Sequence, residues 1–251
     1  MRQLYSANTP CHAGCKYCFA YWKDIYKSQP SIEAAMPHND STIIYPCCDG
    51  ELFEQNDIID NIKSVAHKVK NLYVSVSTKR IITCEEIGRL ISLNEWLKEK
   101  ERGFVKFSVS VTTKSRIDEI EPRAASYNER LLIVEKLKNA NILTSLNIKP
   151  ILPFVSELEY FEILNDFSKY TNHVMLGGLY VNPSSPFYNT YIDGVFDCVI
   201  RKVGWLDNCP EWYYIEDECK TKKIIEHALK LNMQVYKSDV DLINTIKNRA
   251  E

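Results

Sequence analysis

Short runs of β-forming residues alternate along this chain with longer segments in which hydrophobic residues recur at helical intervals. Several short runs lack alternating polar positions, which is typical of strands covered on both faces, as in a parallel sheet. We predict strands over residues 2–5, 41–46, 71–78, 106–113, 143–152 and 173–181. We predict helices over residues 57–70, 84–101, 126–141 and 156–170.

Two of the predicted helices begin with a capping signal. Ser126 is followed by Glu129, and Ser156 by Glu159, in the S-x-x-E pattern of a helix N-terminus. About six β-then-α units predict parallel strands joined by right-handed crossovers, with an open or closed barrel as the architecture. Six units fall short of the eight that close a full barrel.

The alternation of β-forming runs with helical segments becomes irregular after residue 182. It recovers in a helical pattern near 220–231 and a short β-like run at 233–238. We therefore divide the chain into a barrel over residues 1–182 and an irregular C-terminal extension over 183–251. We expect the extension to pack on the barrel as part of the same domain.

The composition is that of an ordinary globular protein, with 251 residues, 45% hydrophobic residues, 25% charged residues and a net charge of −2. This balance argues against a membrane or nucleic-acid partner, although a neutral average can conceal a basic channel. The first residues lack an apolar signal region, and no run of eighteen apolar residues occurs, so we expect a cytoplasmic protein. In that compartment, nine cysteines are expected as thiols or metal ligands.

Three of these cysteines lie close together near the N-terminus. Cys11, Cys15 and Cys18 have C-x3-C-x2-C spacing within "PCHAGCKYCFA". Three thiolates can bind three irons of a [4Fe–4S] cluster and leave the fourth iron open to an exogenous ligand. The spacing therefore predicts a reactive cluster.

Two other readings of the cysteines stay open. A structural zinc needs four ligands, and the nearest candidate, His12, would have to share a tetrahedral metal with the adjacent Cys11. Cys15 and Cys18 also match a redox C-x-x-C pair, but that reading leaves Cys11 unexplained and lacks a thioredoxin-like context. We favour the cluster.

With Tyr17 as the aromatic residue before the last cysteine, the motif resembles the signature of radical S-adenosylmethionine (radical SAM) enzymes. The resemblance implies a partial (β/α)6 barrel in which SAM chelates the open iron. It also implies reductive cleavage of SAM to methionine and a 5′-deoxyadenosyl radical, which removes hydrogen from a substrate. A flavodoxin or ferredoxin is the implied electron donor.

Further segments extend the resemblance. "CDGEL" (48–52) resembles the family's Gly-Gly-Glu segment, with Asp49 in place of the first glycine. "SVSTKR" (75–80) and the E-P-R and E-R-L triplets within 108–153 resemble the branch containing spore photoproduct lyase. The residues that we expect to bind SAM are Asp49, Gly50, Glu51, Thr78, Lys79, Ser110, Thr112, Glu121, Arg123 and Pro150.

These candidates follow predicted strands, whose C-terminal ends converge on one face of a barrel. Glu51 suits the ammonium of SAM, and Lys79 or Thr78 suits its carboxylate. Solvated surface charge is the alternative for Lys79 and Arg123. Glu121 precedes a proline, which alone would explain the end of a loop there.

Three further cysteines, Cys198, Cys209 and Cys219, lie in the extension. The lyase resemblance suggests one of them as a hydrogen-atom donor. An auxiliary cluster is the alternative, although their wide spacing is unlike that of familiar cluster motifs.

We thus expect a radical SAM enzyme, a lyase or transferase, with an unidentified substrate. Repair of a DNA lesion in the manner of spore photoproduct lyase, modification of a peptide or protein, and modification of a small molecule are the alternatives within that class. A non-catalytic zinc-binding module is the alternative from a different class.

Overall fold

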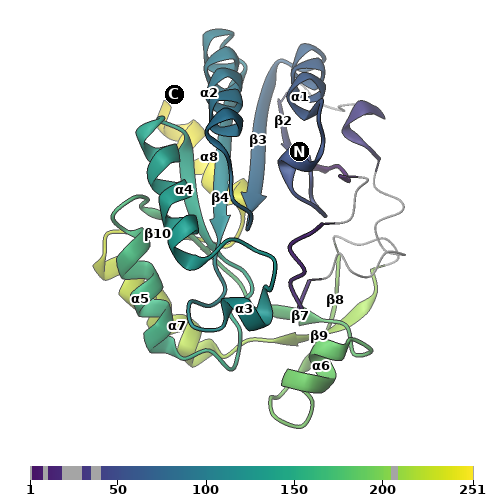
Figure 1. Ribbon diagram of the computed structural model, residues 1–251, viewed down its shortest axis with the longest axis vertical. Helices are drawn as coiled ribbons and strands as arrows, with labels where there is room; N and C mark the ends of the chain where they lie inside the picture. The colour runs from purple at the N-terminus through teal and green to yellow at the C-terminus, as the bar shows by residue number, and fades with distance from the viewer. Residues whose placement is uncertain (1, 8–10, 19–29, 35–40, 205–208, 251) are drawn as a thin grey trace.

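A seven-stranded parallel sheet forms the centre of the computed structural model, which describes residues 2–7, 11–18, 30–34, 41–204 and 209–250 (Figure 1). Its strands, in spatial order, are β1 (Arg2–Leu4), β2 (Ser41–Tyr45), β3 (Asn71–Thr78), β4 (Gly103–Ser110), β5 (Leu143–Ile148), β6 (His173–Leu176) and β10 (Gln234–Tyr236). A smaller antiparallel sheet has the order β7 (Leu179–Val181), β9 (Glu211–Ile215) and β8 (Val199–Lys202).

Helices connect successive strands of the large sheet. The crossover helices are α1 (Ile58–His67), α2 (Cys84–Glu99), α4 (Tyr127–Asn139) and α5 (Glu157–Phe167). The other helices described are η2 (Ile32–Ala34), η3 (Leu52–Glu54), α3 (Ile117–Ile120), α6 (Pro186–Tyr191), α7 (Glu218–Lys230) and α8 (Asp239–Ala250). Among the described residues, no helix has the length and hydrophobicity needed to cross a lipid bilayer.

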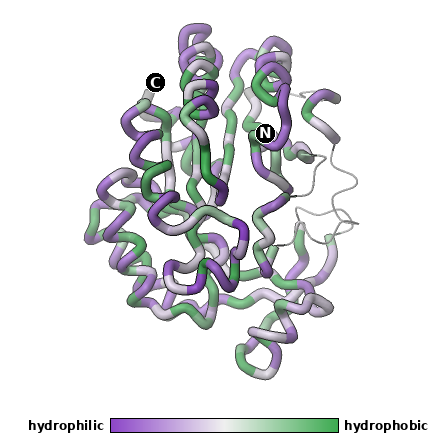
Figure 2. Tube along the Cα trace, in the orientation of Figure 1, coloured by the Kyte–Doolittle hydropathy of each residue, from purple (hydrophilic) through white to green (hydrophobic). Residues whose placement is uncertain are grey.

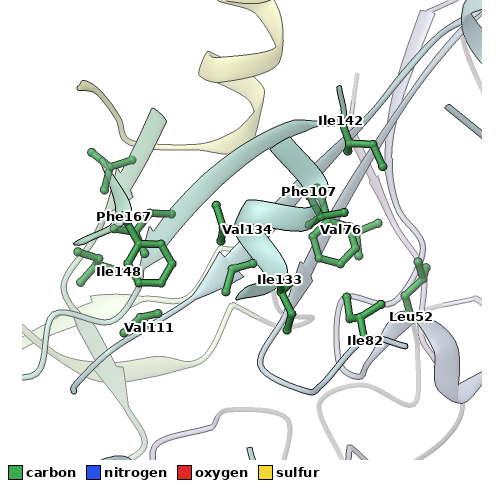
Figure 3. Packing of buried hydrophobic residues seen from close by; sticks show 14 of the residues in the cluster. Leu52, Val76, Ile82, Phe107, Val111, Ile133, Val134, Ile142, Ile148 and Phe167 are labelled. Atoms are coloured by element: carbon green, nitrogen blue, oxygen red, sulfur yellow. The ribbon is translucent and has the colours of Figure 1, made fainter. Parts of the chain in front are cut away.

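The crossover helices cover the hydrophobic face of the sheet. Figure 2 shows hydrophobic stretches along the central strands and mixed stretches along the surrounding helices. In the close view of Figure 3, Val76 and Phe107 of the strands belong to the same packed cluster as Ile133 and Val134 of α4. Successive strand residues face opposite sides of a sheet, so the intervening residues of these strands line the other face.

That other face is also buried, and part of it is polar. Lys106, Ser108 and Ser110 of β4 are at most 1% exposed. Helix α8 covers this face near the N-terminal ends of the strands, where Ile243 packs with Ile43 and Tyr73. The terminal helix therefore fills one end of the barrel interior.

The predicted α/β partial barrel is confirmed, and four predicted helices are found with shorter bounds. Ser126 caps α4 in a complete capping box, and Ser156 accepts a hydrogen bond from the backbone N–H of Glu159. Most predicted strands are found within a few residues. β4 begins and ends three residues earlier than predicted, at Gly103 and Ser110, and β5 ends four residues earlier than predicted, at Ile148.

The prediction of a single strand over 173–181 is wrong. The segment forms β6 and β7, which belong to different sheets and are separated by Gly177 and Gly178. A Cβ atom on Gly178 would lie 2.6 Å from the Tyr214 hydroxyl oxygen, so only glycine allows this close approach.

The C-terminal extension adds a seventh strand to the large sheet, beyond the six that we predicted. β10 pairs in parallel with β6, with Val235 opposite Val174. Helix α7 packs on the barrel, where the His227 ring stacks on Phe161 of α5 at a centroid distance of 4.3 Å. The division at residue 182 remains a proposal.

Candidate functional site

The three-cysteine segment, which we call the cysteine loop (Cys11–Cys18), follows β1 at the C-terminal end of the parallel sheet. Asp49 fixes the chain just before it, because its carboxylate accepts hydrogen bonds from Ser6 Oγ at 2.5 Å and from the Ala7 backbone N–H at 2.7 Å. Asp49 thus positions the start of the cysteine loop.

Backbone contacts hold the cysteine loop against the segment that follows β4. The N–H of Lys16 donates to the Ile120 carbonyl at 2.9 Å, and the N–H of Arg123 donates to the Ala13 carbonyl at 3.2 Å. Gly14 has a φ of +68°, and a Cβ there would lie 2.9 Å from Arg123 Nε. The positive φ favours glycine at this position, whereas the exposed Arg123 side chain could move aside.

Glu121 is the polar centre that joins the cysteine loop to the barrel. It accepts hydrogen bonds from the Tyr17 hydroxyl and from Thr112 Oγ1, the latter at 2.7 Å. Its Oε2 lies 2.6 Å from Arg130 Nη2 in an ion pair without hydrogen-bond geometry, and both side chains are fully buried. Burial raises the pKa of Glu121, but the charges of Lys79 and Arg130 outweigh it, so the pKa is lowered.

Arg130 of α4 is a site residue that the sequence analysis missed. Its Nε and Nη1 donate at 2.9 Å to the carbonyls of Ala125 and Ser110, so it also holds the end of β4. A signal was present in the sequence. Arg130 lies with Tyr127, Val134 and Leu137 on the buried stripe of its helix, where an arginine needs a charged partner.

Glu51 is buried at the end of β3. Its two carboxylate oxygens accept hydrogen bonds from Thr78 Oγ1 at 2.6 Å and from the Lys79 N–H at 2.9 Å. Burial raises its pKa despite these two bonds. Each oxygen retains a lone pair, so the carboxylate can still accept from a ligand.

Lys79 brings positive charge to the cysteine loop. Its Nζ lies 5.6 Å from the centroid of the Tyr17 ring. Burial lowers the pKa of this ammonium, but the Cys15 and Glu121 charges outweigh burial, so the pKa is raised. A cation beside Cys15 suits a site that collects thiolates.

Three cysteines within eight residues form the donor set of the cysteine loop, a number of thiols that suits three irons of a [4Fe–4S] cluster. Among the described residues, no three Cys, His, Asp or Glu side chains converge on one metal position. A zinc ion requires such convergence, whereas each thiolate of a [4Fe–4S] cluster binds a different iron. His12, the fourth zinc ligand considered above, instead places Nδ1 3.0 Å from Glu54 Oε1.

Of the three cysteines of the loop, Cys15 is buried, and Cys11 and Cys18 are half-buried. Burial raises the pKa of Cys11 to about 11 and that of Cys15 to about 12. A metal that binds them must displace these protons, and its positive charge favours the thiolates. All nine cysteines of the chain are free, so Cys15 and Cys18 form no disulfide.

The structure brings only part of the predicted set together. Glu51, Thr78 and Lys79 form one connected group, and Thr112 joins Glu121. Ser110 is buried and donates to the Asn147 carbonyl at 3.4 Å, whereas Arg123 is exposed beside Gly14. Gly50 lies in the turn between Asp49 and Glu51, and Pro150 follows β5.

The cysteines of the extension are not joined to this group. Cys198 places its sulfur 3.4 Å from the Phe196 carbonyl oxygen, and Cys209 and Cys219 are exposed. Within the described residues, no hydrogen bond or ion pair links any of the three to the cysteine loop. Their suggested role as hydrogen donors remains a prediction.

No family model matches the chain, and no curated protein matches its sequence. Among solved structures, spore photoproduct lyase complexed with dinucleoside spore photoproduct matches with a TM-score of 0.61 and 13% identity, over 90% of this chain and 74% of that chain. Streptococcus suis SuiB bound to S-adenosylmethionine matches with 0.53 and 10%, over 94% and 49%. Methylornithine synthase (PylB) matches with 0.53 and 12%, over 93% and 63%. At these identities the likeness establishes the fold alone.

Proposed function

We propose that this chain, which has the fold of radical SAM enzymes, is itself a radical SAM enzyme that holds a [4Fe–4S] cluster through Cys11, Cys15 and Cys18. The observation that carries the proposal is the fixed position of the cysteine loop, which Tyr17 ties to the buried Glu121–Arg130 pair at the C-terminal end of the sheet. Active sites of parallel barrels lie at this end.

When bound, the cluster and SAM supply a 5′-deoxyadenosyl radical by reductive cleavage of SAM, and this radical takes a hydrogen atom from the substrate. Glu51 would accept hydrogen bonds from the SAM ammonium, and the Lys79 ammonium would donate to the SAM carboxylate, because the Thr78 hydroxyl already donates to Glu51. We assign the remaining predicted residues to SAM binding as well, namely Asp49, Gly50, Ser110, Thr112, Glu121, Arg123 and Pro150.

Aromatic residues of the extension shield the cysteine loop from water. The Tyr17 ring contacts Phe187 of α6 edge-on at a centroid distance of 6.0 Å, and Phe187 in turn packs on Tyr191 at 5.0 Å. Phe187 is only 3% exposed. Exclusion of water protects a reactive intermediate from side reactions.

The proposal is tested by anaerobic reconstitution with iron and sulfide. We expect bound iron, a visible charge-transfer absorption, and formation of 5′-deoxyadenosine from SAM after chemical reduction, with flavodoxin or ferredoxin as the natural donor. Cys15→Ala should lose both iron and 5′-deoxyadenosine. Cys84→Ala, which changes an exposed cysteine at the start of α2, is the matched control and should keep both. Retention of both by Cys15→Ala would refute the assignment.

One observation favours a more specific function for this enzyme, that of a lesion-repair lyase. Spore photoproduct lyase matches over more of its own length than SuiB or PylB does, and its matched structure is a complex with dinucleoside spore photoproduct. We therefore expect the reduced, SAM-loaded enzyme to convert that dinucleoside, as followed by chromatography. If it does not, while 5′-deoxyadenosine still forms, a peptide or a small molecule takes its place as the substrate class.

A further inference from the structure

An open cavity of about 560 Å³ lies at the opposite end of the sheet from the cysteine loop. It is lined by residues at the N-terminal ends of β4, β5 and β6, at the C-terminal ends of α2, α4 and α5, and by Ile246 of α8. None of the residues proposed to bind the cluster or SAM lines it. A ligand here would be separate from the proposed radical chemistry.

We propose that this cavity is a second binding site, which takes an organic anion with an aromatic or other hydrophobic body. A volume of this size suits a small molecule. Three features of the lining define the chemical class, namely an amide donor that is open to the cavity, a hydrophobic wall and a positive charge balance.

The amide donor belongs to Asn94 of α2. This side chain lines the cavity and is only 3% exposed. Its Oδ1 accepts a hydrogen bond from the Val105 N–H at 2.9 Å, which fixes the orientation of the amide. Its Nδ2 donates to none of the described residues and is open to the cavity instead of being enclosed. A ligand that presents an acceptor in the cavity can therefore take a hydrogen bond from Asn94.

The hydrophobic wall is formed by Phe104 and Leu143 from the starts of two strands, together with Ile246 from α8. The Tyr170 ring lines the same cavity. Such surfaces stabilise a ligand body with a flat or hydrophobic face. A purely ionic ligand, such as inorganic phosphate, would leave them without contacts.

The charge balance of the lining is positive. Lys98 of α2 and Lys138 of α4 both line the cavity, and among the described residues that form it there is no aspartate or glutamate. Acidic residues outnumber basic ones in the whole chain, 33 to 31, so the composition alone does not explain their absence here. Lysines near helix C-termini also complement the helix dipole. Lys138 Nζ also donates to the Lys169 carbonyl at 2.8 Å, so thermal unfolding of K98E/K138E is measured alongside probe binding to separate this structural role from ligand binding.

The probe is 8-anilinonaphthalene-1-sulfonate, an aromatic anion whose fluorescence rises in a hydrophobic environment, titrated into the full-length protein. We expect one saturable site. The double variant K98E/K138E should weaken binding by at least about tenfold, because both cations become anions. K222E/K230E, which makes the same charge change at exposed positions of α7, is the matched control and should bind as the wild type does.

Asn94→Asp tests the amide donor separately, because it keeps the acceptor for Val105 and replaces the N–H group with an oxygen. We expect weaker binding of the probe, with thermal unfolding measured to confirm that the variant is folded. Unchanged affinity in K98E/K138E, or equal weakening in K222E/K230E, would overturn the proposal. Cys15→Ala should bind the probe normally, so failure of this site and failure of the proposed radical chemistry are distinguishable.

Discussion

Two buried ion pairs hold distant parts of the chain to the same strand, and they differ in how completely they are enclosed. Arg130 and Glu121, beside the C-terminal end of β4, are both 0% exposed. Lys106, near the start of β4, is also 0% exposed, but its partner Asp239 of α8 is 23% exposed. The first pair lies under the cysteine loop, and the second attaches the terminal helix.

The two cations respond differently to enclosure. Arg130 donates to two carbonyls besides its contact with Glu121, and arginine keeps its charge inside proteins. Lys106 donates to Ser108 and Asp239, yet burial lowers its pKa even though Asp239 opposes the shift. The comparison indicates that the permanently charged side chain, Arg130, lies where the position of the cysteine loop depends on it. The Lys106–Asp239 pair lies where water partly reaches the carboxylate.

The largest effect is expected from Arg130→Met. The variant leaves Glu121 as a buried carboxylate without its nearest cation, and breaking such a pair typically costs about 3–5 kcal/mol. Because Tyr17 donates to the same carboxylate, the reconstituted variant should also bind less iron. Urea unfolding and iron analysis measure the two effects. A stable variant with full iron content would show that Lys79 alone is sufficient for Glu121.

A smaller loss of stability is expected from Asp239→Asn. The asparagine keeps an acceptor for Lys106 but removes the charge, and the partial exposure of this position lets water compensate, so we expect about 1–3 kcal/mol. The double variant K106M/D239L removes both charges and should recover most of the loss, as measured by urea unfolding. A loss from Asp239→Asn as large as that from Arg130→Met would contradict the difference drawn between the pairs.

The smallest effect concerns acid stability. Burial raises the pKa of Asp239, but Lys106 outweighs it, so the folded-state pKa is below the ordinary value of 3.8. As pH falls below about 4, the unfolded chain therefore binds the proton first, and stability is lost by at most about 1.4 kcal/mol per pH unit. Asp239→Asn should lack this part of the slope in unfolding measurements between neutral pH and about pH 3. Equal slopes of stability against pH for the wild type and Asp239→Asn would show that Asp239 does not contribute to the loss of stability in acid.

The sequence allowed the alternating architecture and the cysteine loop to be predicted because both depend on local patterns. Strands of a parallel sheet are buried on both faces and read as short hydrophobic runs, and the thiolates lie within a few residues of one another. β10 was not predicted as a member of the large sheet. It has only three residues, Gln234 to Tyr236, and so short a hydrophobic pattern does not show which strand it pairs with.

The polar partners were harder to predict for a related reason. Lys106 opens a predicted strand, but nothing nearby in the sequence indicates a carboxylate 133 residues later. The split between β6 and β7 depends on the approach of Tyr214 to Gly178, which is also a long-range contact. Arg130 was also missed, although its place on a buried helical stripe was visible in the sequence.

The distance along the chain between Lys106 and Asp239 has a consequence for biosynthesis. At 5–20 residues per second, a ribosome adds the 133 residues between them in roughly 7–27 s. During that interval the emerging barrel holds an ammonium group for which no counter-ion has yet been made. Because burying an unpaired charge is costly, we expect the interior beside β4 to stay hydrated in the nascent chain until α8 packs against it.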